Sequence, residues 1–161
     1  MVPPQGKCRF WAGLSGTPAE CEAGKMNEAF SILVTDKNGH VREFLRRELH
    51  EDGYRVYTVR DGRDLLSLLE GETRLDLLIL DLEIPYADES LILEQVLERR
   101  ADLPVVIHTH TPEALDSGHY ASALAIVEKS GDTDNLRRVV RETLQHLFPR
   151  RFASIPPSRP R

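Results

Sequence analysis

The chain has 161 residues, which is enough for one domain and too few for two large ones. Hydrophobic residues make up 40% and charged residues 29%, which is typical of a globular domain, so a collagen, a disulfide-dense miniprotein and a wholly disordered chain are excluded. The formal net charge of −5 argues against a protein that coats nucleic acid by bulk electrostatics.

The two ends of the chain differ from its middle. Residues 149–161 carry four arginines and no acidic residue, so we expect a solvated basic tail there. Residues 1–29 precede the first folded pattern and are predicted to be an N-terminal tail. Because Met26 stands directly before that pattern, translation from Met26 is an alternative.

The sequence predicts a cytoplasmic protein that does not enter a membrane. No stretch reaches the roughly 18 apolar residues of a membrane-spanning helix, and residues 1–25 lack the pattern of a signal peptide. The two cysteines, Cys8 and Cys21, have no nearby histidine or cysteine and form no zinc pattern. The rest of the chain has no cysteine, which suits a reducing compartment.

Five short apolar segments predict the strands of one sheet. They are rich in Leu, Ile and Val, and the third is apolar almost throughout, as in a strand that is covered on both faces. In chain order the predicted strands are 30–35, 54–59, 75–80, 104–107 and 124–127.

An amphipathic segment is predicted to follow each strand as a helix. Apolar residues recur at three- and four-residue spacing, and Gly71 ends the second helix. Thr111 followed by Pro112 is a cap with proline at the first helical position, which predicts a helix between the fourth and fifth strands. In chain order the predicted helices are 41–49, 61–69, 88–100, one that starts at Thr111, and 136–147.

This alternation predicts an α/β fold with a five-stranded parallel sheet, doubly wound, in the order 2-1-3-4-5. Ligands then bind at the carboxyl ends of the strands. Asp36 follows the first strand, Asp81 follows the third, Thr109 ends the fourth and Lys129 follows the fifth. Because these four strands are neighbours in the sheet, we expect the four side chains to meet in one cleft.

The four side chains together indicate phosphoryl chemistry. Each is uninformative alone, since an aspartate after a strand is usually a helix cap or a turn former. A carboxylate accepts a phosphoryl group only where its negative charge is offset, which a divalent cation held by oxygen ligands does. A lysine and a hydroxyl hold the remaining phosphoryl oxygens.

With these residues the chain resembles the receiver domain of two-component response regulators. The resemblance covers 30–148, and its matching segments are ILVTDKN, VREFLRRELHEDGYRV, DLLILDLEIP, LPVVIHT and the EK before the last helix. Pro85, four residues after Asp81, also fits. The resemblance implies the flavodoxin-like receiver fold, with tails at 1–29 and 149–161.

The resemblance also implies roles for the four residues at the strand ends. Asp81 is implied to be the phosphoacceptor and Asp36 to be one of an acidic pair that binds Mg²⁺. Thr109 is implied to be the switch hydroxyl, and Lys129 the lysine that contacts the phosphoryl group. A receiver is not a classical enzyme, although it catalyses its own phosphorylation and dephosphorylation.

The expected function is that of a stand-alone response regulator in phosphorelay signal transduction. A histidine kinase or phosphotransfer protein is the expected phosphodonor, and the output is expected to be a contact with a downstream protein. Only 13 residues follow from Pro149, so we expect no DNA-binding domain and no direct contact with nucleic acid. A homodimer is compatible with the sequence.

Lys37 is the main departure from the family pattern. It stands where the family has a second acidic residue that binds the metal directly, so Mg²⁺ affinity is expected to be weak or lost. Three alternatives remain. Lys37 turns to solvent on its flexible stem, or Glu83 supplies a replacement carboxylate, giving a metal site of Asp36, Asp81 and Glu83, or the Lys37 ammonium stands in for the cation.

Other departures lie at the ends of the fourth and fifth strands. His110 follows the switch threonine, where a small residue is usual, and can cap or block the site. His108 and His110 face the same side of a strand, and we interpret them as histidines that pack at the rim, with a metal site as the weaker alternative. Ile126 replaces an aromatic switch residue and Ser130 a proline. Residues 111–123 match the family poorly.

Two alternative functions follow from these departures. The first is a pseudo-receiver, which is the same fold used as a phosphorylation-independent protein-binding module. The second is a phosphohydrolase of the haloacid dehalogenase type, which also places a nucleophilic aspartate after a buried strand. Such enzymes need a second aspartate two residues later, where this chain has Glu83, and a cap domain for which the chain lacks room.

Overall fold

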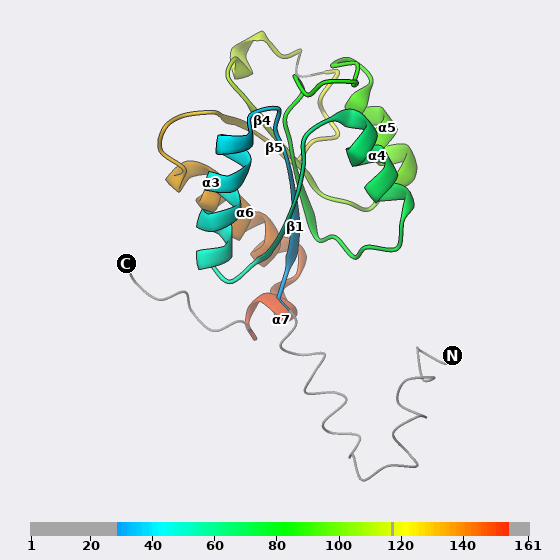
Figure 1. The fold of residues 1–161 in the computed structure, drawn as a ribbon. Helices are drawn as coiled ribbons and strands as arrows, with labels where there is room; N and C mark the ends of the chain where they lie inside the picture. Colours follow the sequence, from blue (N-terminus) through cyan, green and yellow to red (C-terminus); the bar gives the residue numbers. More distant parts are fainter. Residues whose placement is uncertain (1–28, 117, 155–161) are drawn as a thin grey trace, which may run out of the picture.

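A five-stranded parallel sheet in the order β2-β1-β3-β4-β5 forms the centre of the molecule, which confirms the predicted fold class (Figure 1). The computed structural model describes residues 29–116 and 118–154. In chain order the elements are β1 (Ser31–Thr35), α3 (Gly39–Glu51), β2 (Arg55–Val59), α4 (Gly62–Glu70), β3 (Leu77–Leu80), α5 (Ile92–Arg99), β4 (Val105–Thr109), a short 3-10 turn η1 (Pro112–Ala114), β5 (Ala125–Glu128), α6 (Asp134–Leu147) and α7 (Pro149–Phe152).

Two hydrophobic cores lie on opposite faces of the sheet. Helices α3 and α6 cover one face, and α4 and α5 cover the other (Figure 1). Successive residues of β1 and β3 enter the two cores alternately, because side chains alternate across a strand. This explains why β3 is apolar at every position: all four of its residues are buried.

The predicted helix after Thr111 is absent. Only the turn Pro112–Ala114 forms there, and the described residues between it and β5 are irregular. Asp116 Oδ1 accepts a hydrogen bond from the Gly118 backbone N–H at 3.0 Å, a local turn that competes with a helix. The Tyr120 ring is buried in the core, and its hydroxyl donates to the Glu89 carbonyl at 3.2 Å. The segment is therefore held by contacts with the loop before α5.

Where that helix is missing, apolar side chains are exposed on the edge strand β5 and on the residue before it. Leu124 is 54% exposed and Ile126 is 36% exposed. Ile126 pairs with Ile107 of β4, which is buried in the same core as residues of α4 and α5. Ile126 is therefore on the face of the sheet that α4 and α5 cover elsewhere.

Helix α5 is shorter than predicted, beginning at Ile92 instead of Asp88. The Asp88 carboxylate accepts hydrogen bonds from the backbone N–H and the hydroxyl of Ser90, at 2.9 and 2.6 Å. This local turn occupies the residues that periodicity assigned to the first helical turn.

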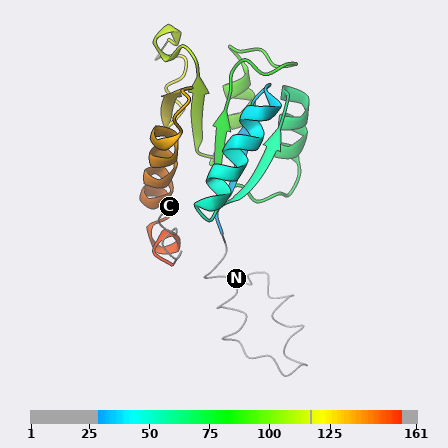
Figure 2. The ribbon, with the colours of Figure 1, turned by 60° about the vertical axis from the view of Figure 1, so that its left-hand side comes forward.

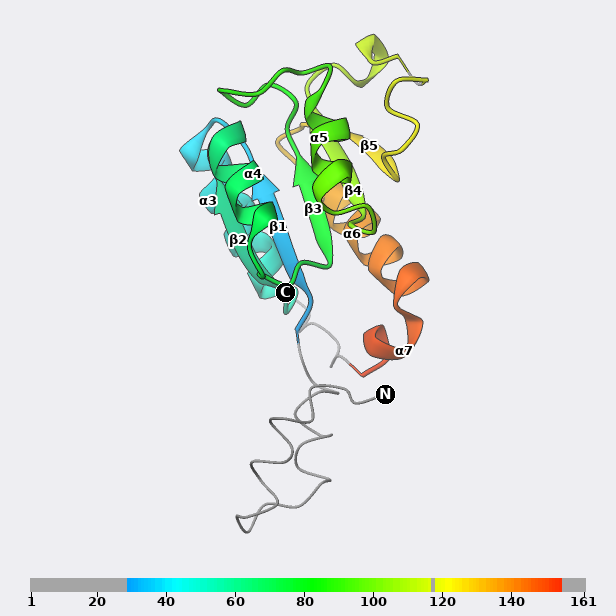
Figure 3. The ribbon, with the colours of Figure 1, turned by 90° about the vertical axis from the view of Figure 1, so that its right-hand side faces the viewer.

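The structure also differs from the prediction of a solvated tail from residue 149. Helix α7 continues below α6, at the end of the sheet where the chain enters β1 (Figures 2 and 3). The rings of Phe148 and Phe152 lie 5.7 and 6.2 Å from the Phe30 ring, centroid to centroid. The folded domain thus extends past residue 148.

Several predictions fall outside the described residues. These are the N-terminal tail up to residue 28, including both cysteines and Met26, and the basic segment 155–161. Within the described part of the chain, no helix is long and apolar enough to cross a membrane.

Candidate functional site

Two buried aspartates and a lysine meet at the carboxyl edge of the sheet. Asp36 follows β1 and Asp81 follows β3, and each is only 1% exposed. The Lys129 ammonium lies 2.7 Å from Asp36 Oδ2 and 2.9 Å from Asp81 Oδ2. The structure therefore brings together three of the four residues in the cleft that the strand order predicts.

Backbone N–H groups hold the other oxygen of each aspartate. Asp36 Oδ1 accepts from the Asn38 N–H at 2.8 Å, and Asp81 Oδ1 accepts from the Glu83 N–H at 3.0 Å. Asp81 Oδ2 is buried and has no hydrogen-bond donor of good geometry in the described residues, so its contact with Lys129 is a charge contact. Asp81 Oδ2 is thus neutralised by the Lys129 ammonium, while Asp81 Oδ1 is held by a backbone N–H.

Thr35 is a site residue that sequence reasoning missed. Its hydroxyl accepts from the Asp81 N–H at 2.9 Å and donates to the Ile79 carbonyl at 3.3 Å. It fixes the end of β3 against the end of β1 and so sets the position of Asp81. A polar residue directly after the apolar run Ile32, Leu33 and Val34 was the available signal.

Thr109 lies buried at the end of β4, on the same edge of the sheet. Its hydroxyl accepts from the Thr111 N–H at 3.3 Å, and its carbonyl accepts from the Lys129 N–H at 2.7 Å. Thr109 therefore neighbours Lys129 through the backbone, while its hydroxyl is engaged in its own loop. Ser130 begins the turn toward α6, where its hydroxyl donates to the Asp132 carbonyl at 2.7 Å.

Lys37 and Glu83 form an ion pair at the mouth of the site. Lys37 Nζ is 2.7 Å from Glu83 Oε2, and the two side chains are 51% and 42% exposed. The pair joins the loop after β1 to the loop after β3. The hydrogen bond to Glu83, then the charge of that carboxylate, and more weakly Asp81 and Asp36, raise the pKa of Lys37. The same hydrogen bond lowers the pKa of Glu83.

The residues as arranged do not fit a divalent cation. Mg²⁺ takes six oxygen ligands in octahedral geometry. The predicted ligands Asp36, Asp81 and Glu83 do not converge, and no group of three or more Asp, Glu, His or Cys residues within 29–116 and 118–154 could hold a metal. Lys129 already contacts both aspartates, and Lys37 binds the third carboxylate.

The two histidines of β4 and its loop are in different environments. His110 is exposed at the rim, as predicted. His108 is buried at 6% exposure, so its prediction as a rim residue is wrong. Burial, followed by the Lys129 charge, lowers the pKa of His108 to about 4, and its Nδ1 has no hydrogen-bond partner within the described part of the chain. His108 is therefore a neutral imidazole beside the site.

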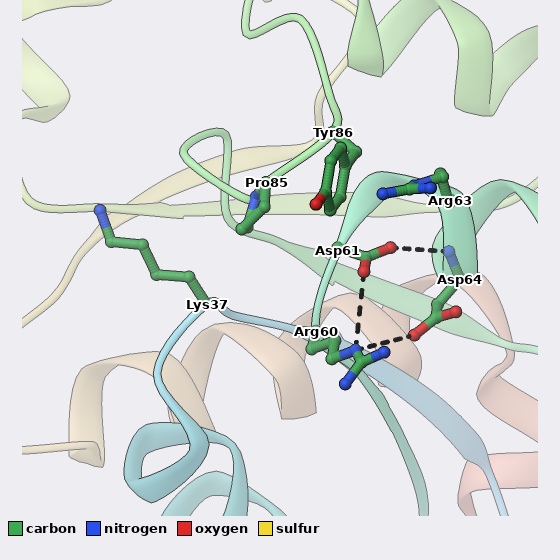
Figure 4. A pocket seen from close by; sticks show the side chains of 7 residues that line it. All are labelled: Lys37, Arg60, Asp61, Arg63, Asp64, Pro85 and Tyr86. Atoms are coloured by element: carbon green, nitrogen blue, oxygen red, sulfur yellow. Dashed lines mark hydrogen bonds and ion pairs between the residues drawn. The ribbon is translucent and has the colours of Figure 1, made fainter.

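A cleft of about 600 Å³ adjoins the site on the β2 side (Figure 4). The Arg63 guanidinium lies 3.5 Å from the centre of the Tyr86 ring, and Arg60 is paired with Asp61 and Asp64. Lys37 also lines the cleft, but its side chain extends away from the other lining groups (Figure 4).

Comparison with known proteins agrees with this geometry. The family model for the response regulator receiver domain matches residues 32–141. Response regulator MprA of Mycolicibacterium vanbaalenii is 38% identical over 78 residues, and its counterpart in Mycobacterium avium is 37% identical over 78. Each match covers 48% of this chain and about a third of the relative's length.

Solved structures show the same similarity. Response regulator TrrA from Thermotoga maritima, crystallised with Mg²⁺ and BeF, has a TM-score of 0.61 and 29% identity, covering 70% of this chain and 97% of TrrA. The structure of TrrA in complex with histidine kinase ThkA has a TM-score of 0.65 and 28% identity, and the match covers 71% of this chain and 98% of the matched chain.

The fold, the site and the family match define a response regulator receiver. The chain belongs to the response regulator receiver domain family of two-component systems. This assignment leaves the phosphohydrolase alternative without support.

Proposed function

We propose that Asp81 accepts a phosphoryl group and that the chain acts as a response regulator receiver in a phosphorelay. The observation that supports this proposal most directly is the buried pair of Asp36 and Asp81, bridged by the Lys129 ammonium at the carboxyl edge of the sheet. A positive charge beside a carboxylate is what a phosphoacceptor needs, because it stabilises the charge that develops during transfer.

The chemistry uses groups that the site already holds. An Asp81 carboxylate oxygen attacks the donor phosphorus and forms a new O–P bond, while the bond from phosphorus to the leaving group breaks and the leaving group keeps the electron pair. Lys129 is the group beside Asp81 Oδ2 that can contact the new phosphoryl oxygens. The Thr109 hydroxyl is the proposed switch, which releases its local hydrogen bond and turns to the phosphoryl group.

We propose that Mg²⁺ binds this receiver only weakly, since Asp36, Asp81 and Glu83 do not converge as arranged. The complex of TrrA with Mg²⁺ and BeF supports Mg²⁺ binding in the family. In this chain the ammonium groups of Lys37 and Lys129 oppose a third positive centre, and Glu83 pairs with Lys37.

The proposed phosphodonor is a histidine kinase or a phosphotransfer protein, as the complex of TrrA with ThkA suggests by similarity. The proposed output is a contact with a downstream protein in the cytoplasm. The exposed Leu124, just before β5, and Ile126, within it, make this edge a candidate for that contact or for a homodimer.

Intact mass after incubation with acetyl phosphate tests the assignment. We expect wild type to gain the mass of one phosphoryl group and Asp81→Asn to gain none, since the near-isosteric amide lacks the nucleophilic charge. Asp102→Asn, at an exposed residue, is the matched control and should be labelled like wild type. Labelling of Asp81→Asn at the wild-type level would overturn the assignment.

The pseudo-receiver is the second candidate function, and two observations favour it. Lys129 already satisfies both aspartates, and the segment after β4 lacks the family's usual helical pattern. A folded protein that gains no mass with acetyl phosphate, with or without Mg²⁺, would establish this alternative over the first.

A further inference from the structure

Phosphorylation of Asp81 adds charge to a site that is already crowded with anions. Asp36 and Asp81 lie buried side by side. The acyl phosphate formed at Asp81 carries about two negative charges where the carboxylate carried one. A second positive charge, besides that of the buried Lys129, would balance the product, and the exposed mouth of the site is where such a group can reach it.

Lys37 is placed to be that group. It directly follows Asp36, so its stem leaves from the same loop, and its ammonium binds Glu83, two residues after Asp81. The ion pair therefore holds the Lys37 ammonium at the mouth of the site, against the loop that carries Asp81.

The backbone that carries Lys37 is fixed while its side chain is free to move. Arg42 Nη1 donates to the Asp36 carbonyl at 2.7 Å and to the Lys37 carbonyl at 3.2 Å. The Lys37 and Glu83 side chains are about half exposed, and exposed ion pairs are weak. An incoming phosphoryl group can therefore compete with Glu83 for the ammonium.

We propose that Lys37 takes the place of the divalent cation, so that Asp81 accepts a phosphoryl group without Mg²⁺. This inference rests on the proposed phosphoacceptor role of Asp81. Lys37 leaves Glu83 and contacts the phosphoryl oxygens from the outer side, while Lys129 contacts them from the inner side. With acetyl phosphate as donor, the Asp81 O–P bond forms, the bond from phosphorus to the acetate oxygen breaks, and acetate leaves with the electron pair.

The test measures labelling rates by intact mass with acetyl phosphate in excess EDTA and again with Mg²⁺. We expect wild type in EDTA to react within about threefold of its rate with Mg²⁺. Lys37→Met should lose about tenfold or more of the rate in EDTA, because a charge that stabilises the transition state is gone. Lys37→Arg keeps the charge and should stay within about threefold of wild type.

A second variant separates charge from loop structure. Glu83→Gln breaks the ion pair but leaves Lys37 in place, so its rate in EDTA should equal or exceed that of wild type. Lys37 and Glu83 are both exposed, so these variants should unfold at the same temperature as wild type, which circular dichroism checks.

The outcomes distinguish this inference from the function on which it rests. Wild type that is labelled only with Mg²⁺, or Lys37→Met that reacts in EDTA as fast as wild type, would overturn the role of Lys37 and leave Asp81 as the phosphoacceptor. No labelling of wild type under either condition would overturn the phosphoacceptor role itself.

Discussion

His108 is a titratable side chain in a setting that excludes its charged form. His108 is 6% exposed. The charge of Lys129 opposes protonation of its imidazole, and the charges of Asp36 and Asp81 favour it. Burial dominates and lowers its pKa from 6.5 to about 4. Its unpartnered Nδ1 adds a desolvation cost to the folded state.

This shift predicts that stability falls as the pH falls from about 6.5 to about 4. In that window the unfolded chain binds a proton at His108 and the folded chain does not, so stability rises with pH and levels off above the unfolded pKa. The contribution of His108 across the window is up to about 3 kcal/mol.

Urea unfolding at several pH values measures this contribution. We expect His108→Leu to flatten the pH dependence between 6.5 and 4 and to leave stability at pH 7 unchanged or higher, since an apolar side chain suits the buried position. The exposed His110→Gln is the control and should keep the wild-type slope. An unchanged slope in His108→Leu would contradict a neutral buried histidine.

A second prediction at the scale of one residue concerns the Mg²⁺ affinity of a Lys37 variant. Lys37→Asp replaces a cation by a carboxylate beside Asp36, frees Glu83 from its ion pair and supplies a third oxygen ligand. We expect Mg²⁺ to bind this variant about tenfold or more tighter than wild type. Amide NMR shifts during a Mg²⁺ titration measure both affinities, and equal affinities would show that Lys37 exerts no influence on the aspartate pair.

At the scale of elements, the loop after β3 rests on the first residue of α4. The Gly62 N–H donates to the Pro85 carbonyl at 2.8 Å. A Cβ at Gly62 would lie 2.5 Å from the Tyr86 carbonyl oxygen and 2.8 Å from Ala87 Cβ. Tyr86 itself has a φ of +57°, which is uncommon for a residue other than glycine. Gly62 thus allows the close approach that holds this loop.

Gly62→Ala is therefore expected to destabilise the protein by about 1 to 3 kcal/mol, because backbone must move to admit the methyl group. Gly39→Ala is a matched control, since Gly39 is likewise the first residue of its helix and its Cβ would meet only the flexible end of Arg42 at 3.4 Å. Thermal unfolding compares the two. Equal stability of both variants would mean that the loop shifts without cost.

Periodicity predicted the elements that bury a regular apolar stripe, and it failed where side chains bind their own backbone. The five strands and helices α3, α4 and α6 lie where the sequence predicted them, within a few residues. The start of α5 and the segment after Thr111 were mispredicted, because Asp88 and Asp116 form local turns there. Such competition depends on hydrogen bonds that a pattern of apolar residues does not reveal.

The site was predictable to the extent that strand order determines it. Asp36, Asp81 and Lys129 meet because β1, β3, β4 and β5 are neighbours in the sheet. The pairing of Lys37 with Glu83 was not predictable, because it joins two loops whose side chains are free to choose other partners or solvent. Sequence reasoning left three alternatives for this part of the site, with Lys37 in solvent, Glu83 as a metal ligand or Lys37 in place of the cation, and the structure shows the contact between Lys37 and Glu83.

At the scale of the whole molecule, α7 closes the end of the sheet opposite the site. Arg151 Nη2 binds Asp76 Oδ2 at 3.0 Å and the Ala29 carbonyl at 3.1 Å, and its guanidinium lies 4.1 Å from the centre of the Phe30 ring. Asp76 precedes β3 and Asp81 follows it, so this contact and the phosphoacceptor lie about 16 Å apart along the strand. Arg151 of α7 therefore joins the chain before β1 to the residue before β3, at the edge of the sheet remote from Asp81.

Arg151→Ala tests this separation of stability from function. Asp76 is 4% exposed, so removal of its arginine leaves a buried carboxylate that retains the Ser31 N–H at 2.8 Å as a donor. We expect a loss of about 2 to 4 kcal/mol of unfolding free energy, somewhat below the cost of breaking a fully buried pair. Arg150→Ala, on the exposed side of the same helix, should lose less than about 0.5 kcal/mol.

Labelling by acetyl phosphate gives the second half of the test. Because Arg151 acts at the far end of β3, Arg151→Ala should be labelled at the wild-type rate wherever it is folded. A variant that keeps its stability would show that the Phe148 and Phe152 contacts with Phe30 hold α7 without the ion pair. A folded variant with slowed labelling would show instead that the two ends of β3 are coupled.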